Sequence, residues 1–324
     1  MMSIVKKAKN KIKKLLGKTP EKTLYENYYN KYQRFSFVDG SCTDEKQFEA
    51  SITRLYHTVE KGLSYLNYRP GFGKENVEAL VRSLEQYSKQ YSVDKFFYQT
   101  ALSVLNEYIR KNAEHGVENK ELSKRISALP GKKNEAGGAI KFVPLSSEEL
   151  SKANYKELVE TRHSIRHFSD KPVELERVEN AVKLAQYTPS ACNRQGWKTY
   201  IVNDKAVLRE VLKNQNGNRG FGQEFDKLLV VVGDLRCFNR DREVFQVYID
   251  GGMYAMRVLD SLYYERIASV PLSASLTKEQ EENVRKLLKL DPAEVLIMFI
   301  GIGNYPDECQ TTRSERKPAE YTVI

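Results

Sequence analysis

Two short polar segments near the middle of the chain carry residue types that bind phosphorylated rings. The first, Arg162-His-Ser-Ile-Arg166, places two guanidinium groups, an imidazole and a hydroxyl within five residues. The second, Pro189-Ser-Ala-Cys-Asn-Arg-Gln195, follows about twenty residues later. Cationic and hydroxyl donors suit a phosphate, and Asn and Gln amides suit the edges of an amide-like ring. Together the segments predict a site for a phosphorylated aromatic cofactor.

The order and spacing of these segments resemble those of the nitroreductase family of FMN-dependent oxidoreductases. That family opens with an Arg-Arg-Ser-x-Arg-x-Phe-like run and continues with Pro-Ser-x-x-Asn-x-Gln-x-Trp. The matching residues here are Arg162, Ser164, Arg166 and Phe168, followed by Pro189, Ser190, Asn193, Gln195 and Trp197. His163 stands where a second Arg is commoner, and Gly196 where Pro is frequent. The resemblance covers residues 148–324.

The resemblance implies an α+β nitroreductase fold, with a central mixed, mainly antiparallel sheet flanked by helices. It also implies FMN binding, for which the matching positions are Arg162, His163, Ser164, Arg166, Pro189, Ser190, Asn193, Gln195, Leu272, Ser273 and Arg316. Arg316 belongs to a closing Arg-x-Pro segment, and Arg313 is its rival for the phosphate. The correspondence of residues 271–274 to the backbone facing flavin N5 is weak. There Arg266-Ile-Ala-Ser269 replaces the usual Gly-Leu-Gly.

In such an enzyme the flavin carries the chemistry, so no catalytic side chain is required. By resemblance, Arg166 favours the reduced flavin near N1, while Asn193 and Gln195 contact the ring edge or ribityl chain. The implied cycle is ping-pong: NAD(P)H reduces FMN, and a small-molecule acceptor oxidises it. Two alternatives stay open. One is a specialised flavin enzyme that performs dehydrogenation, dehalogenation or flavin fragmentation. The other is a non-enzymatic, membrane-associated partner with a vestigial flavin site.

Regular elements must position these segments. Ser146 and Glu149 predict a capped helix extending to about Arg162. The pattern further predicts helices over 174–186, over 242–266 and from Thr277 onward, with strands over 197–202, 227–233 and 295–301. Helix 242–266 is apolar nearly all round, so it must be buried centrally or against a second subunit. The resemblance implies an obligate homodimer there, with Asp250-Gly-Gly252 matching the family's Asp-x-Gly pattern.

The front half of the chain is predicted to be helical. Apolar stripes over 77–87 and 96–109 have helical spacing, and a run rich in Pro and Gly predicts a linker. The predicted domains are therefore a basic helix (1–22), a helical region (23–130), a linker (131–147) and an FMN domain (148–324). His57, Glu60 and Lys61 share one helix face. They form either a local ion-pair cluster or a place where His57 or Lys61 meets the substrate.

This helical front half is similar to that of nitroreductase-like proteins encoded with surface-polysaccharide enzymes, which implies a sugar-linked substrate. The net charge of +9 gives no case for nucleic-acid binding, because residues 1–22 hold eight lysines and one acid and the rest is nearly neutral. Residues 1–18 form a basic amphipathic pattern, suited to an anionic membrane surface, to a solubilising terminus or to a helix docked on its own protein. Four cysteines without paired spacing predict neither a metal site nor a disulfide framework. A cytoplasmic protein, with peripheral contact to the inner membrane face, is expected.

Overall fold

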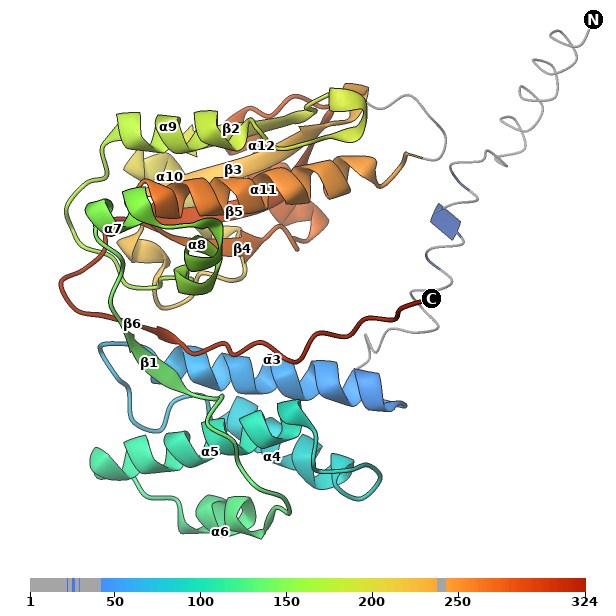
Figure 1. Cartoon of the computed structure of the whole chain (residues 1–324), viewed down its shortest axis with the longest axis vertical. Helices are drawn as coiled ribbons and strands as arrows, with labels where there is room; N and C mark the ends of the chain where they lie inside the picture. The colour runs from blue at the N-terminus through green and yellow to red at the C-terminus, as the bar shows by residue number, and fades with distance from the viewer. Residues whose placement is uncertain (1–21, 23–24, 27–28, 30–41, 238–242) are drawn as a thin grey trace, which may run out of the picture. The chain divides into compact units, whose positions relative to one another are not determined.

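The computed structural model describes residues 22, 25–26, 29, 42–237 and 243–324. The chain divides into two compact units (Figure 1). Unit 1 comprises residues 1–38, 145–162 and 168–304, and unit 2 comprises residues 39–144, 163–167 and 305–324. Both units therefore draw on segments from either side of the predicted boundary at residue 148. Apart from Lys22, the predicted basic helix lies outside the described residues.

Unit 1 is built on a four-stranded sheet with the strand order β2-β3-β5-β4. Its strands are β2 (Trp197–Val202), β3 (Lys227–Asp234), β4 (Ala268–Ser273) and β5 (Glu294–Gly303). Every pairing between these strands is antiparallel, which confirms the mainly antiparallel sheet. The three predicted strands are confirmed as β2, β3 and β5. Pro271 lies in the edge strand β4, where a missing backbone N–H is tolerated.

Helices cover both faces of this sheet. Helices α9 (Leu175–Ala185) and α11 (Gln246–Tyr264) pack together, and α11 crosses all four strands. They share a core with Leu229 and Val231 of β3. The alternate β3 residues, Leu228, Val230 and Val232, must point to the opposite face, and they are equally buried. Helix α10 (Lys205–Lys213) packs on β2 and β3 and against α12 (Lys278–Leu288).

The long helix α11 is buried along only one side within the single chain. Its inward residues include Tyr254, Val258 and Leu262, which are essentially inaccessible. Its other side carries large apolar side chains that are 41% to 54% exposed, namely Tyr248, Ile249, Met253 and Met256. Helices α9 and α11 are both present as predicted, with α11 shorter than the predicted range 242–266.

The prediction of one helix reaching Arg162 is wrong, because the segment forms two helices. Helix α7 (Ser147–Lys152) begins with the predicted capping box of Ser146 and Glu149. It ends before Asn154, whose side chain accepts the Glu157 N–H and starts α8 (Tyr155–Thr161). Glu157 in turn accepts the Asn154 N–H at 2.9 Å. This second capping box satisfies the backbone donors of a new helix start and so interrupts the first helix.

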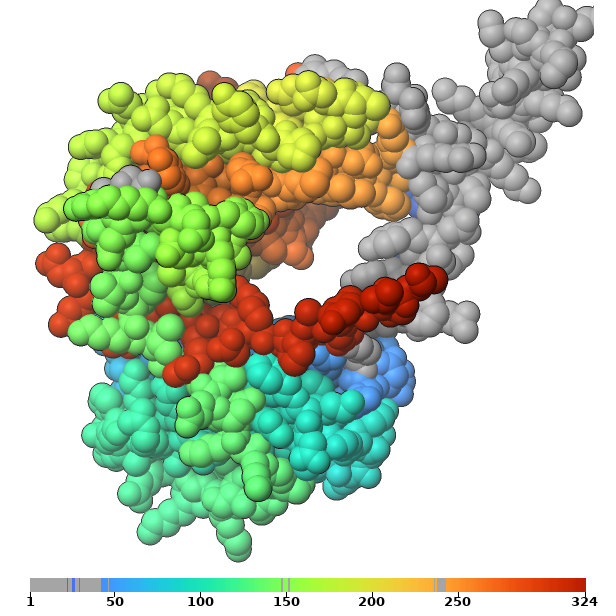
Figure 2. Space-filling model, in the orientation of Figure 1, coloured from blue at the N-terminus to red at the C-terminus, as the bar shows by residue number. Residues whose placement is uncertain are grey.

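Unit 2 contains a helical bundle and a two-stranded ribbon. Helices α3 (Glu45–Leu63), α4 (Lys74–Tyr87), α5 (Phe96–Glu114) and α6 (Lys120–Ala128) share one core, which confirms the helical front region. In space-filling form these helices, blue to green, make one continuous mass (Figure 2). Strand β1 (Ala139–Phe142) lies in the predicted linker and pairs with β6 (Cys309–Thr312). Across the described residues, no helix combines the length and apolarity needed to cross a bilayer.

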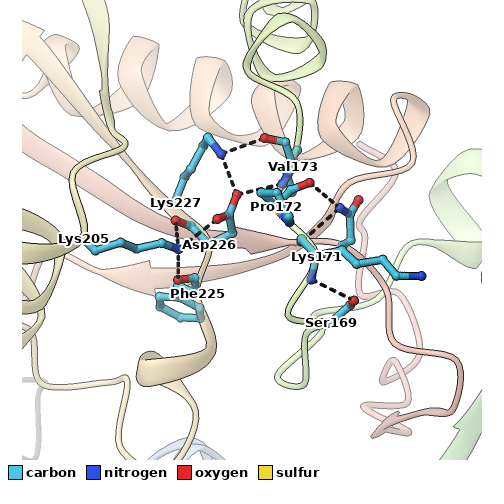
Figure 3. A network of polar contacts seen from close by, with 9 residues as sticks. Ser169, Lys171, Pro172, Val173, Lys205, Phe225, Asp226 and Lys227 are labelled. Carbon is cyan, nitrogen blue, oxygen red and sulfur yellow. Dashed lines mark hydrogen bonds and ion pairs between the residues drawn. The ribbon is translucent and has the colours of Figure 1, made fainter.

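A network of ion pairs and hydrogen bonds holds the segment that precedes α9 (Figure 3). Asp226, just before β3, accepts hydrogen bonds from the Val173 N–H (2.8 Å) and from Lys205 Nζ (2.8 Å). Lys227 is almost fully buried and donates both to Asp226 (2.5 Å) and to the Val173 carbonyl (2.7 Å). The network joins the chain before α9 to the start of β3, and it pairs the buried ammonium as a buried charge requires.

Candidate functional site

The first predicted segment begins in unit 1, where α8 ends. Arg162 follows the last residue of α8 in an extended backbone conformation, and its N–H donates to the Leu158 carbonyl. Burial raises the pKa of Asp260 on α11, and the positive charges of Arg162 and Arg257 oppose that rise. The half-buried Arg162 side chain is therefore within electrostatic reach of the central helix.

The next five residues, 163–167, belong to unit 2 and contact its β1–β6 ribbon. The Ser164 carbonyl accepts a hydrogen bond from Thr311 Oγ1 of β6 at 2.8 Å. The His163 ring lies 5.1 Å from the ring of Phe142 on β1, measured between centroids. Both half-buried residues are thus held by the β1–β6 ribbon, which local sequence patterns did not predict.

Arg166 is a buried cation. Its side chain is 9% exposed, and burial lowers the pKa of the guanidinium, while Tyr65 and Glu60 act in the opposite direction. Its one hydrogen bond to a described residue is a long one, 3.4 Å from Nη1 to the Ser164 carbonyl. No described carboxylate lies within ion-pair distance of it. A buried guanidinium with so few partners is costly unless an acceptor or anion completes it.

The C-terminal end of α3 contributes further charged groups to the surroundings of Arg166. Glu60 is fully buried, with one carboxylate oxygen 3.1 Å from His57 Nδ1 and the other accepting the Gly138 N–H at 3.0 Å. Burial lowers the pKa of Lys61, and the Arg166 charge lowers it further. His57 and Glu60 thus form a local hydrogen-bonded pair at this helix end, as one of the two interpretations predicted. A role for His57 or Lys61 toward a substrate stays a prediction.

The second predicted segment forms a tight loop in unit 1 after α9. It contains a short 3₁₀ turn (Ala191–Asn193), and Cys192, Asn193 and Gln195 all have left-handed backbone conformations with φ between 49° and 54°. Such conformations cost L-residues roughly 1 kcal/mol each, so the surroundings must hold the loop in place. Pro189, Asn193 and Gln195 are exposed, and Ser190 is half-buried.

Three contacts anchor this loop. The Ala191 N–H donates to Asp250 (3.1 Å), a buried carboxylate on α11 that also accepts from Gln246 Nε2 (2.8 Å). Ser190 Oγ accepts the Gln195 N–H at 2.9 Å. The Gln195 amide donates to Asn193 Oδ1 at 3.1 Å, so the two predicted ring-contacting amides lie side by side.

A bidentate ion pair completes the anchoring. Arg194 Nη1 and Nη2 each lie 2.9 Å from a Glu243 carboxylate oxygen, and Arg194 Nε donates to the Ala191 carbonyl. Neither residue of this pair was predicted from the sequence. They are 49 positions apart, and no local pattern links a loop arginine to a glutamate so distant. Asp250 was already matched to the family's Asp-x-Gly pattern, and Gln246 could have been found from it, since the two are four positions apart on one helix face.

The predicted pair Leu272 and Ser273 lies at the end of β4. Leu272 is buried, whereas Ser273 is exposed and its carbonyl accepts from Gln215 Nε2 at 3.0 Å. Arg266, which stands where the family has its Gly-Leu-Gly, adopts a left-handed backbone with φ 55°. The conformation that glycine favours is therefore kept although the glycine is absent.

The two rival arginines both belong to unit 2. Arg313 is half-buried, and its N–H donates to the Gly138 carbonyl at 2.9 Å. Arg316 is exposed, and its guanidinium donates to the Ser314 carbonyl at 2.7 Å. The neighbouring Lys317 pairs with Glu49 of α3 at 3.0 Å. Which arginine meets a phosphate stays a prediction.

Comparison with known proteins gives a family match for one stretch of the chain. Residues 159–304 match the sequence model of the family described as the nitroreductase family. Residues 159–304 are a nitroreductase-family domain. Both cofactor segments, Leu272 and Ser273 fall inside the matched range, whereas Arg313 and Arg316 lie beyond it. The family match identifies this part of the chain as an oxidoreductase of the flavoprotein type.

Individual relatives of the nitroreductase domain differ in the activity for which they are named. A protein of Archaeoglobus fulgidus named for NADH dehydrogenase and NAD(P)H nitroreductase activity is 28% identical over 155 residues, which is 47% of this chain and 85% of the relative. An iodotyrosine deiodinase of Nematostella vectensis is 23% identical over 214 residues, 55% of this chain and 78% of the relative. Among solved structures, an FMN-dependent nitroreductase of Clostridium difficile is 20% identical, with a TM-score of 0.41, covering 51% of this chain and 91% of that one.

Proposed function

We propose that this protein is an FMN-dependent oxidoreductase that takes hydride from NAD(P)H and delivers it to a small-molecule acceptor. The proposal depends on the family match over residues 159–304, which contains both cofactor segments. FMN, when bound, would accept the two electrons and pass them on in a separate half-reaction. The protein's own residues bind and orient the cofactor and the two substrates in turn.

The residues present fit such a cofactor, and Arg166 is the observation that carries the fit. A buried guanidinium with one long hydrogen bond is under-satisfied in the described structure. An electron-accepting ring that gains negative charge on reduction would supply the missing partner. In this proposal Arg166 stabilises the reduced state, and it does so more strongly because it is shielded from water.

The remaining residues have supporting roles in the proposal. Arg162, His163, Ser164 and Arg316 or Arg313 supply cations and donors for the phosphate, and Pro189, Ser190, Asn193 and Gln195 form the loop that meets the ring edge or ribityl chain. The fixed position of Asn193 beside Gln195 supports this, since two preorganised amides lose little entropy on binding. Leu272 and Ser273 stay the proposed neighbours of flavin N5.

Reductive dehalogenation is the second function to consider, because iodotyrosine deiodinases occur among the relatives. Besides the one from Nematostella, an iodotyrosine deiodinase of Haliscomenobacter hydrossis is 35% identical over 98 residues, although these cover only 43% of that relative. The two functions share the flavin and differ in the acceptor. The link to surface polysaccharides, which would name a third kind of acceptor, stays a prediction.

A substrate comparison distinguishes these functions. Purified protein supplied with FMN is given NADH or NADPH, and then either 4-nitrobenzoate or 3-iodotyrosine as acceptor. The proposal predicts nicotinamide oxidation that depends on the nitro compound. Double-reciprocal plots of the initial rate at several acceptor concentrations should give the parallel lines of a ping-pong cycle. Release of iodide from 3-iodotyrosine when dithionite is the reductant, with no oxidation of either nicotinamide, would favour dehalogenation instead. Failure of both acceptors and both nicotinamides to react in the presence of FMN would contradict the proposed activity.

We further propose that the protein is a homodimer joined along α11. Its support is the exposed apolar side of that helix, whose four large side chains a monomer would leave in water. Binding of residues 1–18 to an anionic membrane, and a cytoplasmic location, stay predictions, since those residues lie outside the described part of the chain.

A further inference from the structure

A cavity of about 500 Å³ opens between three helices of unit 2. It is bounded by the start of α4, the end of α5 and the start of α6, and none of its lining residues belongs to the proposed flavin segments. The lining comprises Gly71, Lys74, Glu78, Tyr108, Ile109, Asn112, Ala113, Val117, Glu118, Asn119, Lys120, Leu122 and Ser123. Sites for small organic ligands typically have volumes of roughly 300–1,000 Å³, so this cavity is of a suitable size.

The inner part of the cavity is apolar. Tyr108 and Leu122 are buried there, and Ile109 and Val117 provide further aliphatic surface. The polar groups at this depth are already engaged. Asn112 donates to the Tyr108 carbonyl (2.8 Å) and accepts the Gly71 N–H (2.5 Å), and the Tyr108 hydroxyl donates to the Phe72 carbonyl (2.8 Å). An occupant must therefore place an apolar body inside, because polar groups would lose water there without gaining equal partners.

The rim of the cavity carries a different chemistry. Lys74 and Lys120, the first residues of α4 and α6, are both exposed, and neither makes an ion pair with a described residue. The lining carboxylate of Glu78 is paired with Arg125 Nη1 at 2.6 Å, and the same guanidinium also binds Glu85, which does not line the cavity. Among the described residues at the rim, Glu118 is the one negative charge that forms no ion pair with a described cation. Two ammonium groups over an apolar interior are complementary to an organic anion.

We propose that this cavity binds a small amphipathic anion, with an apolar body and a single carboxylate or sulfonate group that meets Lys74 and Lys120. A body of roughly 12 to 20 non-hydrogen atoms matches a pocket of this size. The site is separate from the proposed flavin chemistry and does not depend on it. It gives the helical bundle a ligand of its own.

Calorimetric titration with 1-naphthaleneacetate tests the site, with its neutral analogue 1-naphthaleneethanol as the comparison. The full-length protein is titrated with FMN present in excess and again without FMN. The proposal predicts one saturable site with a Kd of about 100 µM for the anion, as expected for a ligand of this size. The alcohol should bind about fivefold more weakly, because exposed ion pairs contribute modestly. Absence of saturable binding at millimolar anion in both titrations would overturn the proposal.

Matched variants locate the binding. Ala113, an exposed lining residue of α5, is changed to Trp to fill the cavity, and Ala128, exposed on α6 outside the lining, is changed to Trp as the control. Ala113→Trp should weaken binding at least about tenfold, and Ala128→Trp should leave it unchanged. Equal affinity in both variants, each with wild-type helicity by circular dichroism, would show that the anion binds elsewhere and would overturn the assignment.

Surface-charge variants test the anionic part without altering the core. The double variant Lys74→Gln/Lys120→Gln should raise the Kd of 1-naphthaleneacetate about fivefold and leave that of the alcohol unchanged. The control pair Lys89→Gln/Lys124→Gln removes two exposed lysines of the same unit that do not line the cavity. If both double variants raised the Kd of 1-naphthaleneacetate equally, the attraction would come from the general charge of the unit. This result would contradict recognition of the anion by Lys74 and Lys120.

Discussion

At the scale of single residues, Arg166 connects the sequence motif to a physical property that the motif does not contain. The motif alone indicates a cation, whereas the structure shows a buried one with one long hydrogen bond to the described residues. Such a residue lowers the stability of the unliganded protein, because its charge is removed from water without full compensation. A functional role for Arg166 should therefore appear as opposite effects on stability and on cofactor binding.

Arg166→Met is the variant that shows these opposite effects. It should raise the free energy of unfolding of the FMN-free protein by about 1 kcal/mol, since an apolar side chain replaces an incompletely paired buried charge. It should also raise the Kd for FMN about ten- to hundredfold, through loss of a charged hydrogen bond. Urea unfolding and FMN titration measure the two quantities. Arg82→Met, at an exposed position of α4, is the control. A variant that is less stable and binds FMN normally would make Arg166 a structural residue.

At the scale of elements, the sequence predicted the helices and strands that have an apolar pattern within their own residues. The stripe of apolar residues in α4 at helical spacing and the apolar runs of β2, β3 and β5 all identify their elements within a few residues. The ribbon of β1 and β6 was not predicted, because its two short strands are about 170 residues apart and Gly137 and Gly138 precede β1. The break at Asn154 could have been predicted from the sequence, because Asn154 and Glu157 form a second capping box after that of Ser146 and Glu149.

In the candidate site, too, local sequence patterns were predictive and contacts between distant residues were not. Residue identities in the two segments were available from the sequence, but the contacts that hold the loop after α9 were not. Arg194 reaches Glu243, and Ala191 reaches Asp250, across separations for which one sequence gives no pairing rule. The resemblance placed Asp250 on the central helix without giving its role, which is to hold the loop that carries Asn193 and Gln195.

The Arg194–Glu243 pair should act on FMN binding through the shape of this loop. Arg194→Gln and Glu243→Gln should each raise the Kd for FMN about fivefold, and the double variant should be no worse than either single one, because one interaction is lost in all three. Fluorescence titration of FMN measures this, with Arg209→Gln, an exposed arginine of α10, as the control. Strictly additive effects of the two changes would show that the pair does not act as a unit.

The network around Asp226 should govern acid stability of unit 1 (Figure 3). Burial raises the pKa of Asp226, but hydrogen bonds from Lys205, Lys227 and the Val173 N–H outweigh it, so the pKa is lowered overall. Such a group stabilises the fold fully above the pKa of about 4 of an unfolded carboxyl, and this stabilisation is lost as pH falls through the folded value.

Asp226→Asn should accordingly lower the free energy of unfolding by about 2 kcal/mol at pH 7, leaving Lys227 buried with one partner fewer. The difference from the natural chain should shrink steadily below about pH 4. Chemical unfolding across that pH range measures it, and Asp170→Asn, at an exposed position nearby, should change stability by less than about 0.5 kcal/mol. A destabilisation that persisted unchanged at low pH would rule out the ionised carboxylate as its cause.

At the scale of the whole molecule, the proposed dimer follows from α11. Ile249→Asp/Met253→Asp places two charges on its exposed apolar side, and it should convert a dimer into a monomer at about 10 µM protein, because burying unpaired carboxylates in an interface is strongly unfavourable. Light scattering after size-exclusion chromatography gives the mass. Tyr155→Asp, at an exposed position of α8, should stay dimeric. A natural chain that is monomeric at about 50 µM would contradict the proposal, since obligate dimers do not dissociate in that range.

One absorption experiment shows whether the protein binds FMN and uses it with NAD(P)H. The spectrum of the purified full-length protein, supplemented with FMN and freed of excess cofactor, is recorded before and after anaerobic addition of NADH or NADPH. We expect flavin bands that remain with the protein and bleach with one of the nicotinamides. Retained flavin that neither nicotinamide bleaches would contradict the proposed electron donor. Protein that retains no flavin would contradict the account as a whole.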